Sequence, residues 1–121
     1  MAVINLQPQV LDLVLYAGDG VELRFICQTP AGAPIDVTGG VRAQIRVDRL
    51  SDDPPVAEFT VSLVDAYQGV VVITLTGEQT QDLVEPSGKF VGVWDLEWDA
   101  SVEEPRTLVQ GRVECVADVT R

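Results

Sequence analysis

Apolar and polar residues alternate with a period of two in short segments, and clusters of Gly, Pro, Asp and Ser separate these segments. Successive side chains of a β-strand point to opposite faces, so the pattern is typical of a β-sandwich or barrel. We therefore expect an all-β domain. The predicted strands lie in residues 10–16, 21–28, 41–48, 57–63, 70–75, 90–98 and 107–119.

The segments between the strands indicate turns and one short helix. Residues 17–20 contain two glycines and predict a tight turn that reverses the chain after the first strand. Thr76 and Gln79 have the spacing of a helix capping box, which predicts one short helical turn near residues 77–83. Pro86 and Gly88 then end the helix.

Two of the late strands differ from the others in their apolar content. In residues 90–98, alternation places both tryptophans, Trp94 and Trp98, on one face, so this strand is expected at the centre of the core. In the last strand, Gly111 interrupts an otherwise apolar row and predicts a β-bulge nearby.

The polar face of residues 41–48 has two arginines on an otherwise acidic chain. Arg42 and Arg46 are separated by Gln44 and share this face, so they are candidates for contact with a partner. Cross-strand pairing with an acid such as Glu58 would explain the same stripe. The sequence leaves both interpretations open.

The first nine residues precede the first clear strand, although they include the apolar residues Ile4 and Leu6. Such a segment suits an arm that becomes ordered on a partner, and an ordinary edge strand explains it equally well. No internal repeat or linker divides the remaining residues. We therefore expect an N-terminal arm or edge strand in residues 1–9 and a single sandwich domain in residues 10–121.

The charge of the chain narrows the range of partners. Nineteen acidic residues oppose eight basic residues, and the formal net charge is −11. This charge disfavours nucleic acid and anionic membrane surfaces, whereas a basic protein or a divalent cation remains compatible with it. A well-solvated surface would also explain it. No apolar run approaches the roughly 20 residues of a membrane helix, and the first residues lack a signal-like pattern, so we expect a soluble protein.

The residue types offer little for catalysis or metal binding. The chain has no histidine, which removes the usual base for a Ser or Cys nucleophile, and two distant cysteines make no zinc site. Cys27 and Cys115 indicate small buried hydrophobes, with an inter-sheet disulfide as the alternative. The acidic pairs Asp52-Asp53 and Glu103-Glu104 lack the spacing of a calcium loop. We predict no enzyme, no cofactor and no metal.

The order of the turn motifs resembles a family of virion domains. A strand ends in Gly18-Asp19, a proline and glycine loop follows, and the later motifs come in a fixed order. They are Pro34-Ile35-Asp36-Val37-Thr38-Gly39, Val41-Arg42-Ala43-Gln44-Ile45-Arg46, Gly88-Lys89-Phe90, Trp94-Asp95-Leu96 and Asp118-Val119-Thr120-Arg121. This order, which spans nearly the whole chain, resembles the immunoglobulin-like β-sandwich domains of baseplate upper proteins and minor tail proteins of tailed phages.

The resemblance implies an immunoglobulin-like antiparallel β-sandwich of about seven to eight strands. It also implies a non-catalytic virion protein of the tail or baseplate, assembled in the host cytoplasm. Its partners would be other virion proteins in a symmetric homo-oligomeric assembly, without nucleic acid or membrane. Two alternatives remain: a capsid decoration or head-associated subunit, and a carbohydrate- or receptor-binding module that uses exposed aromatic residues such as Tyr16 or Tyr67.

Overall fold

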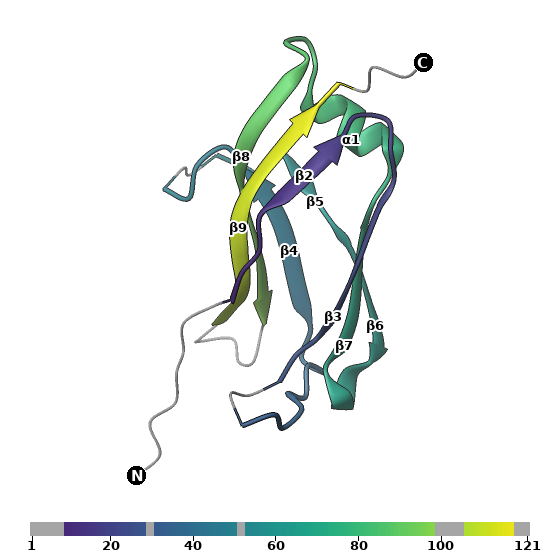
Figure 1. Ribbon diagram of the computed structural model, residues 1–121. Helices are drawn as coiled ribbons and strands as arrows, with labels where there is room; N and C mark the ends of the chain where they lie inside the picture. The colour runs from purple at the N-terminus through teal and green to yellow at the C-terminus, as the bar shows by residue number, and fades with distance from the viewer. Residues whose placement is uncertain (1–8, 29–30, 51–52, 99–105, 118–121) are drawn as a thin grey trace.

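The computed structural model describes residues 9–28, 31–50, 53–98 and 106–117, which form two β-sheets packed face to face (Figure 1). These residues make nine strands, one 3-10 helix and one short α-helix. The elements are β1 (Gln9–Val10), β2 (Leu13–Tyr16), β3 (Val21–Ile26), β4 (Val41–Arg46), β5 (Ala57–Glu58), β6 (Thr60–Asp65), η1 (Ala66–Gln68), β7 (Val70–Leu75), α1 (Gly77–Leu83), β8 (Lys89–Trp98) and β9 (Arg106–Val116).

The strand order is that of an immunoglobulin-like sandwich. The larger sheet has the order β1-β9-β8-β4-β5, with β2 also paired to β9, and the smaller sheet has the order β3-β7-β6. In the immunoglobulin fold, strands B, E and D share one sheet and strands C, F and G share the other. Here β3, β7 and β6 take the first three positions, and β4, β8 and β9 take the second three. The predicted fold class is confirmed.

The first strand departs from the antiparallel pattern expected for the whole sandwich. β1 and β2 pair with β9 in parallel, with Gln9 opposite Val109 and Leu13 opposite Val113. All the other paired strands are antiparallel. The chain does reverse after β2, but it crosses to the smaller sheet, so β2 and β3 belong to different layers (Figure 1).

Two of the predicted strands are each divided, which raises the number from seven to nine. Residues 10–16 form β1 and β2, because the ladder with β9 is interrupted at Leu11 and Asp12. Residues 57–63 divide at Phe59, where the chain leaves β5 in the larger sheet and enters β6 in the smaller sheet. Phe59 is buried at this crossing, with 4% of its surface exposed.

The turn after β2 is held by a buried threonine of α1. The backbone N–H of Gly18 donates to Thr80 Oγ1 at 3.0 Å, and that hydroxyl donates to the carbonyl of Asp19 at 2.9 Å. Thr80 is fully buried. At the start of the same helix, the predicted capping box is confirmed, because Thr76 and Gln79 each accept the other's backbone N–H.

The core lies between the centres of the two sheets. Trp94 of β8 is 1% exposed, and its ring centroid lies 6.1 Å from that of Phe25 and 5.9 Å from that of Phe59. From the smaller sheet, Val71 and Ile73 of β7 are fully buried. The expectation of a tryptophan at the centre of the core is confirmed for Trp94, whereas Trp98 is half-buried at the end of β8.

The two cysteines are buried and free. Burial raises the pKa of both the Cys27 and the Cys115 thiol. They therefore behave as small hydrophobic residues in the described core, and the inter-sheet disulfide does not form.

The predicted bulge in the last strand is present, but it lies before Gly111. Leu96 pairs with Val109 and Glu97 pairs with Thr107, so Leu108 is the extra residue of β9. No helix among the described residues has the length and apolar character needed to cross a membrane.

Candidate interaction surface

The outer face of the larger sheet has a row of polar side chains from three neighbouring strands. Arg42, Gln44 and Arg46 alternate with the buried residues of β4 and therefore point to solvent. Across the ladder, Glu97 of β8 lies opposite Arg42, and Asp95 lies opposite Gln44. This register places Arg42 opposite a carboxylate, whereas Arg46 lies opposite Val93.

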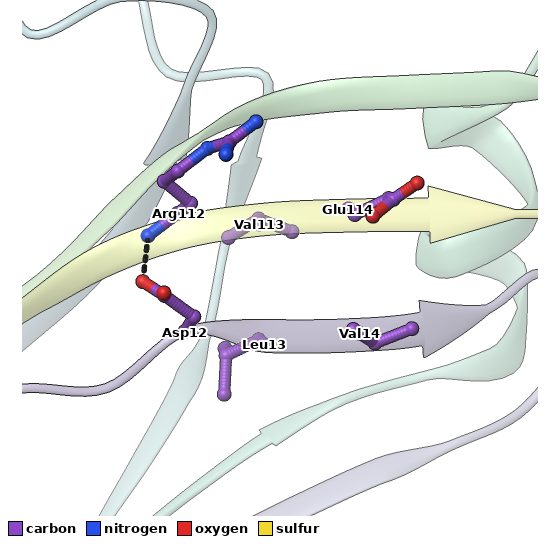
Figure 2. A pocket seen from close by; sticks show the side chains of 6 residues that line it. All are labelled: Asp12, Leu13, Val14, Arg112, Val113 and Glu114. Carbon is purple, nitrogen blue, oxygen red and sulfur yellow. Dashed lines mark hydrogen bonds between the residues drawn. The ribbon is translucent and has the colours of Figure 1, made fainter.

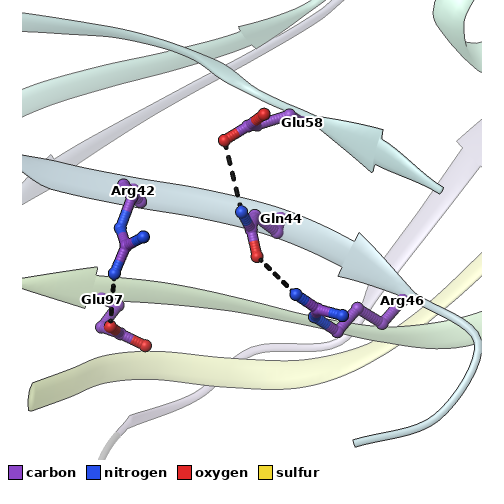
Figure 3. Close-up of polar contacts among 5 residues, drawn as sticks. All are labelled: Arg42, Gln44, Arg46, Glu58 and Glu97. Atoms are coloured by element: carbon purple, nitrogen blue, oxygen red, sulfur yellow. Dashed lines mark hydrogen bonds and ion pairs between the residues drawn. The ribbon is translucent and has the colours of Figure 1, made fainter. Parts of the chain in front are cut away.

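These side chains bind one another along the sheet (Figure 3). Arg42 Nη2 lies 3.1 Å from Glu97 Oε1, and Gln44 Nε2 donates to Glu58 Oε1 at 3.3 Å. Arg46 donates to Gln44 Oε1 at 3.2 Å and to the carbonyl of Asp53. Cross-strand pairing therefore occurs, but Glu58 is not the partner of an arginine. Arg42 pairs with Glu97, and Glu58 accepts a hydrogen bond from Gln44.

The ion pair on this face is weakly stabilising. The side chain of Arg42 is 55% exposed and that of Glu97 is 27% exposed, so water competes for both groups. Pairs of this kind contribute about 0–1 kcal/mol to stability. The pair orders the Arg42 side chain while leaving much of it accessible, and its use by a partner remains a prediction.

Asp95 is the least favourably placed carboxylate of this network. Partial burial raises its pKa above the ordinary value, and the neighbouring Glu97 carboxylate raises the pKa further. The guanidinium groups of Arg49, Arg46 and Arg42 oppose this rise. A raised pKa means that the folded state binds this proton more tightly than the unfolded state, so the contribution of Asp95 to stability falls as the pH rises.

We therefore expect Asp95→Asn to stabilise the protein at pH 7, by at most about 1 kcal/mol, which is the scale of a partly exposed charge. The gain should disappear in acid, below the ordinary aspartate pKa of about 3.9, because both states are then protonated. Urea unfolding of both proteins at pH 7, 5 and 3 measures this difference. A variant no more stable than the wild type at pH 7 would contradict the pKa direction.

Beside this network, three exposed apolar side chains form a second feature of the same face. Val14 and Tyr16 of β2 are 61% and 51% exposed, and Val91 of β8 is 44% exposed. Glu114 of β9 lies between Val14 and Val91 in register and binds Lys89 at 3.1 Å. We call Val14, Tyr16 and Val91 the β2 patch. Exposed apolar side chains gathered on one sheet face are candidates for a protein contact.

A shallow hollow of about 220 Å³ adjoins the β2 patch (Figure 2). It runs between β2 and β9. Its lining residues are Asp12, Leu13, Val14, Arg112, Val113 and Glu114. The hollow is open to solvent, so it extends the patch at Val14 and does not form a closed site.

The wall of the hollow depends on an exchange of hydrogen bonds at the interruption between β1 and β2. In a regular parallel ladder, the N–H of Arg112 would donate to the carbonyl of Leu11. That carbonyl instead accepts from the Trp94 indole Nε1 at 2.7 Å. Asp12 Oδ1 then accepts the Arg112 N–H at 2.9 Å, so a carboxylate replaces the lost carbonyl (Figure 2).

The other predicted site residues give no further chemistry. Ile4 and Leu6 lie outside the described residues, as do Asp52, Glu103 and Glu104. In the part of the chain that is described, no three His, Cys, Asp or Glu side chains come together as a possible metal site. The sequence patterns did not indicate the positions of Asp12, Val14 and Val91, because each takes its role from a neighbouring strand.

The class of protein defined by this fold is the immunoglobulin-like β-sandwich. No family model matches the chain, and no curated protein sequence matches it. Among solved structures, it is similar to the Listeria monocytogenes internalin-like protein lmo2027, with a TM-score of 0.43 and 13% sequence identity. The match covers 92% of this chain and 28% of that protein. A likeness at this level supports no statement about function.

Proposed function

We propose that this chain is a non-catalytic structural subunit of a tailed-phage virion, a connector or adaptor of the tail or baseplate. In this role the sandwich packs against other virion proteins. The proposal combines the resemblance of the motif order to phage sandwich domains with the surface of the larger sheet.

The observation that supports a packing role best is the β2 patch. Its three apolar side chains are between 44% and 61% exposed. Val14 and Tyr16 are neighbours on one face of β2, and Val91 lies on the same sheet face, across Glu114 from Val14. Covering such side chains with a partner removes apolar surface from water, at about 25 cal/mol per Å². The strand that bears Val14 and Tyr16 is also an edge of its sheet, so a partner reaches both without displacing another strand.

The charge of the chain favours a protein as the partner. A net charge of −11 opposes binding to phosphate backbones, whereas it is compatible with a basic protein surface. The ion pair of Lys89 and Glu114, with Glu114 between Val14 and Val91, supplies polar groups within the same surface.

We expect the double variant Val14→Asp/Tyr16→Asp to be lost from phage particles, because two charges would have to be buried in the contact. The matched control is Val47→Asp, which changes a valine of similar exposure, 62%, outside the patch. Mass spectrometry of purified particles should find the wild type and the control at equal copy number. It should find the double variant reduced at least about tenfold, provided that all three fold with similar stability.

Two outcomes would contradict the proposal. The first is absence of the wild-type chain from purified particles while it is abundant in the infected cell. The second is incorporation of the double variant at the wild-type level. A reconstruction of the particle would further separate a tail or baseplate position from the alternative of a capsid decoration or head-associated subunit.

The carbohydrate- or receptor-binding alternative would use exposed aromatic residues. Tyr16 is 51% exposed and Tyr67 is 71% exposed. However, Tyr16 lies on β2 of the larger sheet, whereas Tyr67 lies in η1, which follows β6 of the smaller sheet. Among the tryptophans, Trp94 is buried in the core. Glycan binding that disappeared on changing either tyrosine to alanine would favour this alternative.

A further inference from the structure

The smaller sheet has a long unpaired edge at β3. Its strand order is β3-β7-β6, so no described strand continues the sheet beyond β3. The six residues of β3 pair with β7 without a register shift. The other described edges are less suitable templates: β5 has two residues, β2 has four, and a bulge between Leu63 and Asp65 interrupts β6.

The hydrogen-bonding groups along this edge can be assigned from the ladder. The N–H of Cys27 donates to the carbonyl of Gly69 at 2.8 Å, which sets the parity of the pairing with β7. In an antiparallel ladder the residues that bond to the partner alternate with those that point away. The N–H and C=O groups of Glu22, Arg24 and Ile26 therefore point away from β7, toward the open edge.

The side chains of β3 are amphipathic in a way that suits an added strand. Val21, Leu23 and Phe25 face the interior, yet each is only partly buried. Val71 and Ile73 of the neighbouring strand β7 are fully buried. The edge thus leaves apolar surface of the interior accessible to water, and a strand added beside β3 would cover it.

The chain contains one segment that fits this edge in length and pattern. Residues 2–7, which lie outside the described residues, read Ala-Val-Ile-Asn-Leu-Gln and have no charge and no proline. As a strand, their alternation would place Ala2, Ile4 and Leu6 on one face and Val3, Asn5 and Gln7 on the other. A neutral segment also avoids adding to the repulsion between two copies that each have a net charge of −11.

We infer that residues 2–7 of one copy bind as an added strand along β3 of a second copy, with Ile4 and Leu6 directed toward its interior. This inference rests on the proposed structural role and names the partner as a second copy of the chain. Backbone hydrogen bonds would come from the free groups of β3, as in other cases of strand addition. Because arm and edge are different surfaces, reciprocal exchange between two copies closes a dimer, whereas one-way binding builds a ring or a continuing row of subunits.

Two kinds of variant of the full chain remove one surface each. Ile4→Asn/Leu6→Asn removes the apolar face of the arm, and Val3→Asn is its control, because Val3 falls on the opposite face. Arg24→Pro removes an N–H that points to the open edge and keeps the bonds to β7, whereas Arg24→Ala changes the side chain and keeps that N–H. Glu22→Pro tests the edge a second time, and circular dichroism confirms that each variant is folded.

Light scattering with size-exclusion chromatography should show that the wild type self-associates as its concentration rises. The arm and edge variants should each be monomeric, with the dissociation constant raised at least about tenfold, and both controls should associate. A mixture of the Arg24→Pro and Ile4→Asn/Leu6→Asn proteins should form a one-to-one dimer, because the first keeps its arm and the second keeps its edge.

A wild type that remains monomeric, or variants that associate as the wild type does, would overturn the inference. A mixture that remains monomeric beside a self-associating wild type would also overturn it, because that mixture contains both an intact arm and an intact edge. An arm variant that still self-associates would indicate pairing of two β3 edges, and a monomeric wild type is the result expected if the arm docks on its own sandwich. The proposed virion role is tested separately, since a monomer that is still incorporated into particles would leave that role standing and exclude the arm exchange.

Discussion

Replacing Gly111 with alanine is expected to destabilise the protein by about 3 kcal/mol, at the upper end of the usual cost of strain in a well-packed interior. A Cβ at this position would lie 2.0 Å from the carbonyl oxygen of Leu11 and 3.0 Å from Asp12 Oδ1. The first contact is with backbone, so no side-chain rotation relieves it. The segment that joins β1 to β2 would have to move away from β9.

The displacement would also break the hydrogen bonds that replace the regular ladder. The carbonyl of Leu11 would move away from the Trp94 indole, and Asp12 would lose its position at the N–H of Arg112. Leu13 and Leu15, which β2 contributes to the core, would be loosened with them. The tryptophan emission of the folded variant should therefore differ from that of the wild type, and chemical unfolding should show the loss of stability.

The matched control for this prediction is Gly20→Ala. A Cβ at Gly20 would lie 3.7 Å from the carbonyl oxygen of Leu75, which is an ordinary contact. We expect a change of less than about 1 kcal/mol there. Urea unfolding of both variants measures the difference, and a Gly111→Ala protein as stable as Gly20→Ala would contradict the close approach of Leu11.

The alternation of apolar residues was sufficient to predict a β-sandwich but not the points where strands divide. Leu11, Leu13 and Leu15 continue one pattern across the interruption between β1 and β2. The division depends on the Trp94 indole, which is 83 residues away from Leu11 in the sequence. A local pattern has no information about a donor that arrives from another strand.

The division between β5 and β6 was not predicted, for a similar reason. Ala57, Phe59 and Val61 alternate without a break, although the chain changes sheet at Phe59. Alternation specifies which side chains face the interior, and the interior lies between both sheets. A strand that crosses from one layer to the other therefore keeps its apolar pattern.

Of the candidate surface, the sequence predicted the two arginines of β4, Arg42 and Arg46, but not their partners. Gln44 lies opposite Glu58, so Arg42 would face Thr60 if β5 continued. Thr60 already belongs to β6 in the other sheet, which leaves Glu97 of β8 as the acid beside Arg42. The choice between Glu58 and Glu97 thus follows from where β5 ends, and this depends on the crossing at Phe59.

Replacing Trp94 with phenylalanine is expected to cost about 2 kcal/mol, since it leaves the carbonyl of Leu11 without its indole donor and removes buried volume. Trp94→Ala should cost more, about 3–5 kcal/mol, because it opens a cavity between Phe25 and Phe59. Urea unfolding followed by circular dichroism measures both, without relying on tryptophan fluorescence.

The indole and the Asp12 carboxylate act on the same segment, so their effects should not be independent. With the indole removed, the carbonyl of Leu11 is available to the N–H of Arg112, and the acceptor supplied by Asp12 matters less. We expect the double variant Trp94→Phe/Asp12→Ala to cost about 0.5–1 kcal/mol less than the sum of the two single variants. The control cycle combines Trp94→Phe with Asp82→Ala on the exposed side of α1. The costs of these two substitutions should add. Equal additivity in both cycles would show that the indole and the carboxylate stabilise the edge independently.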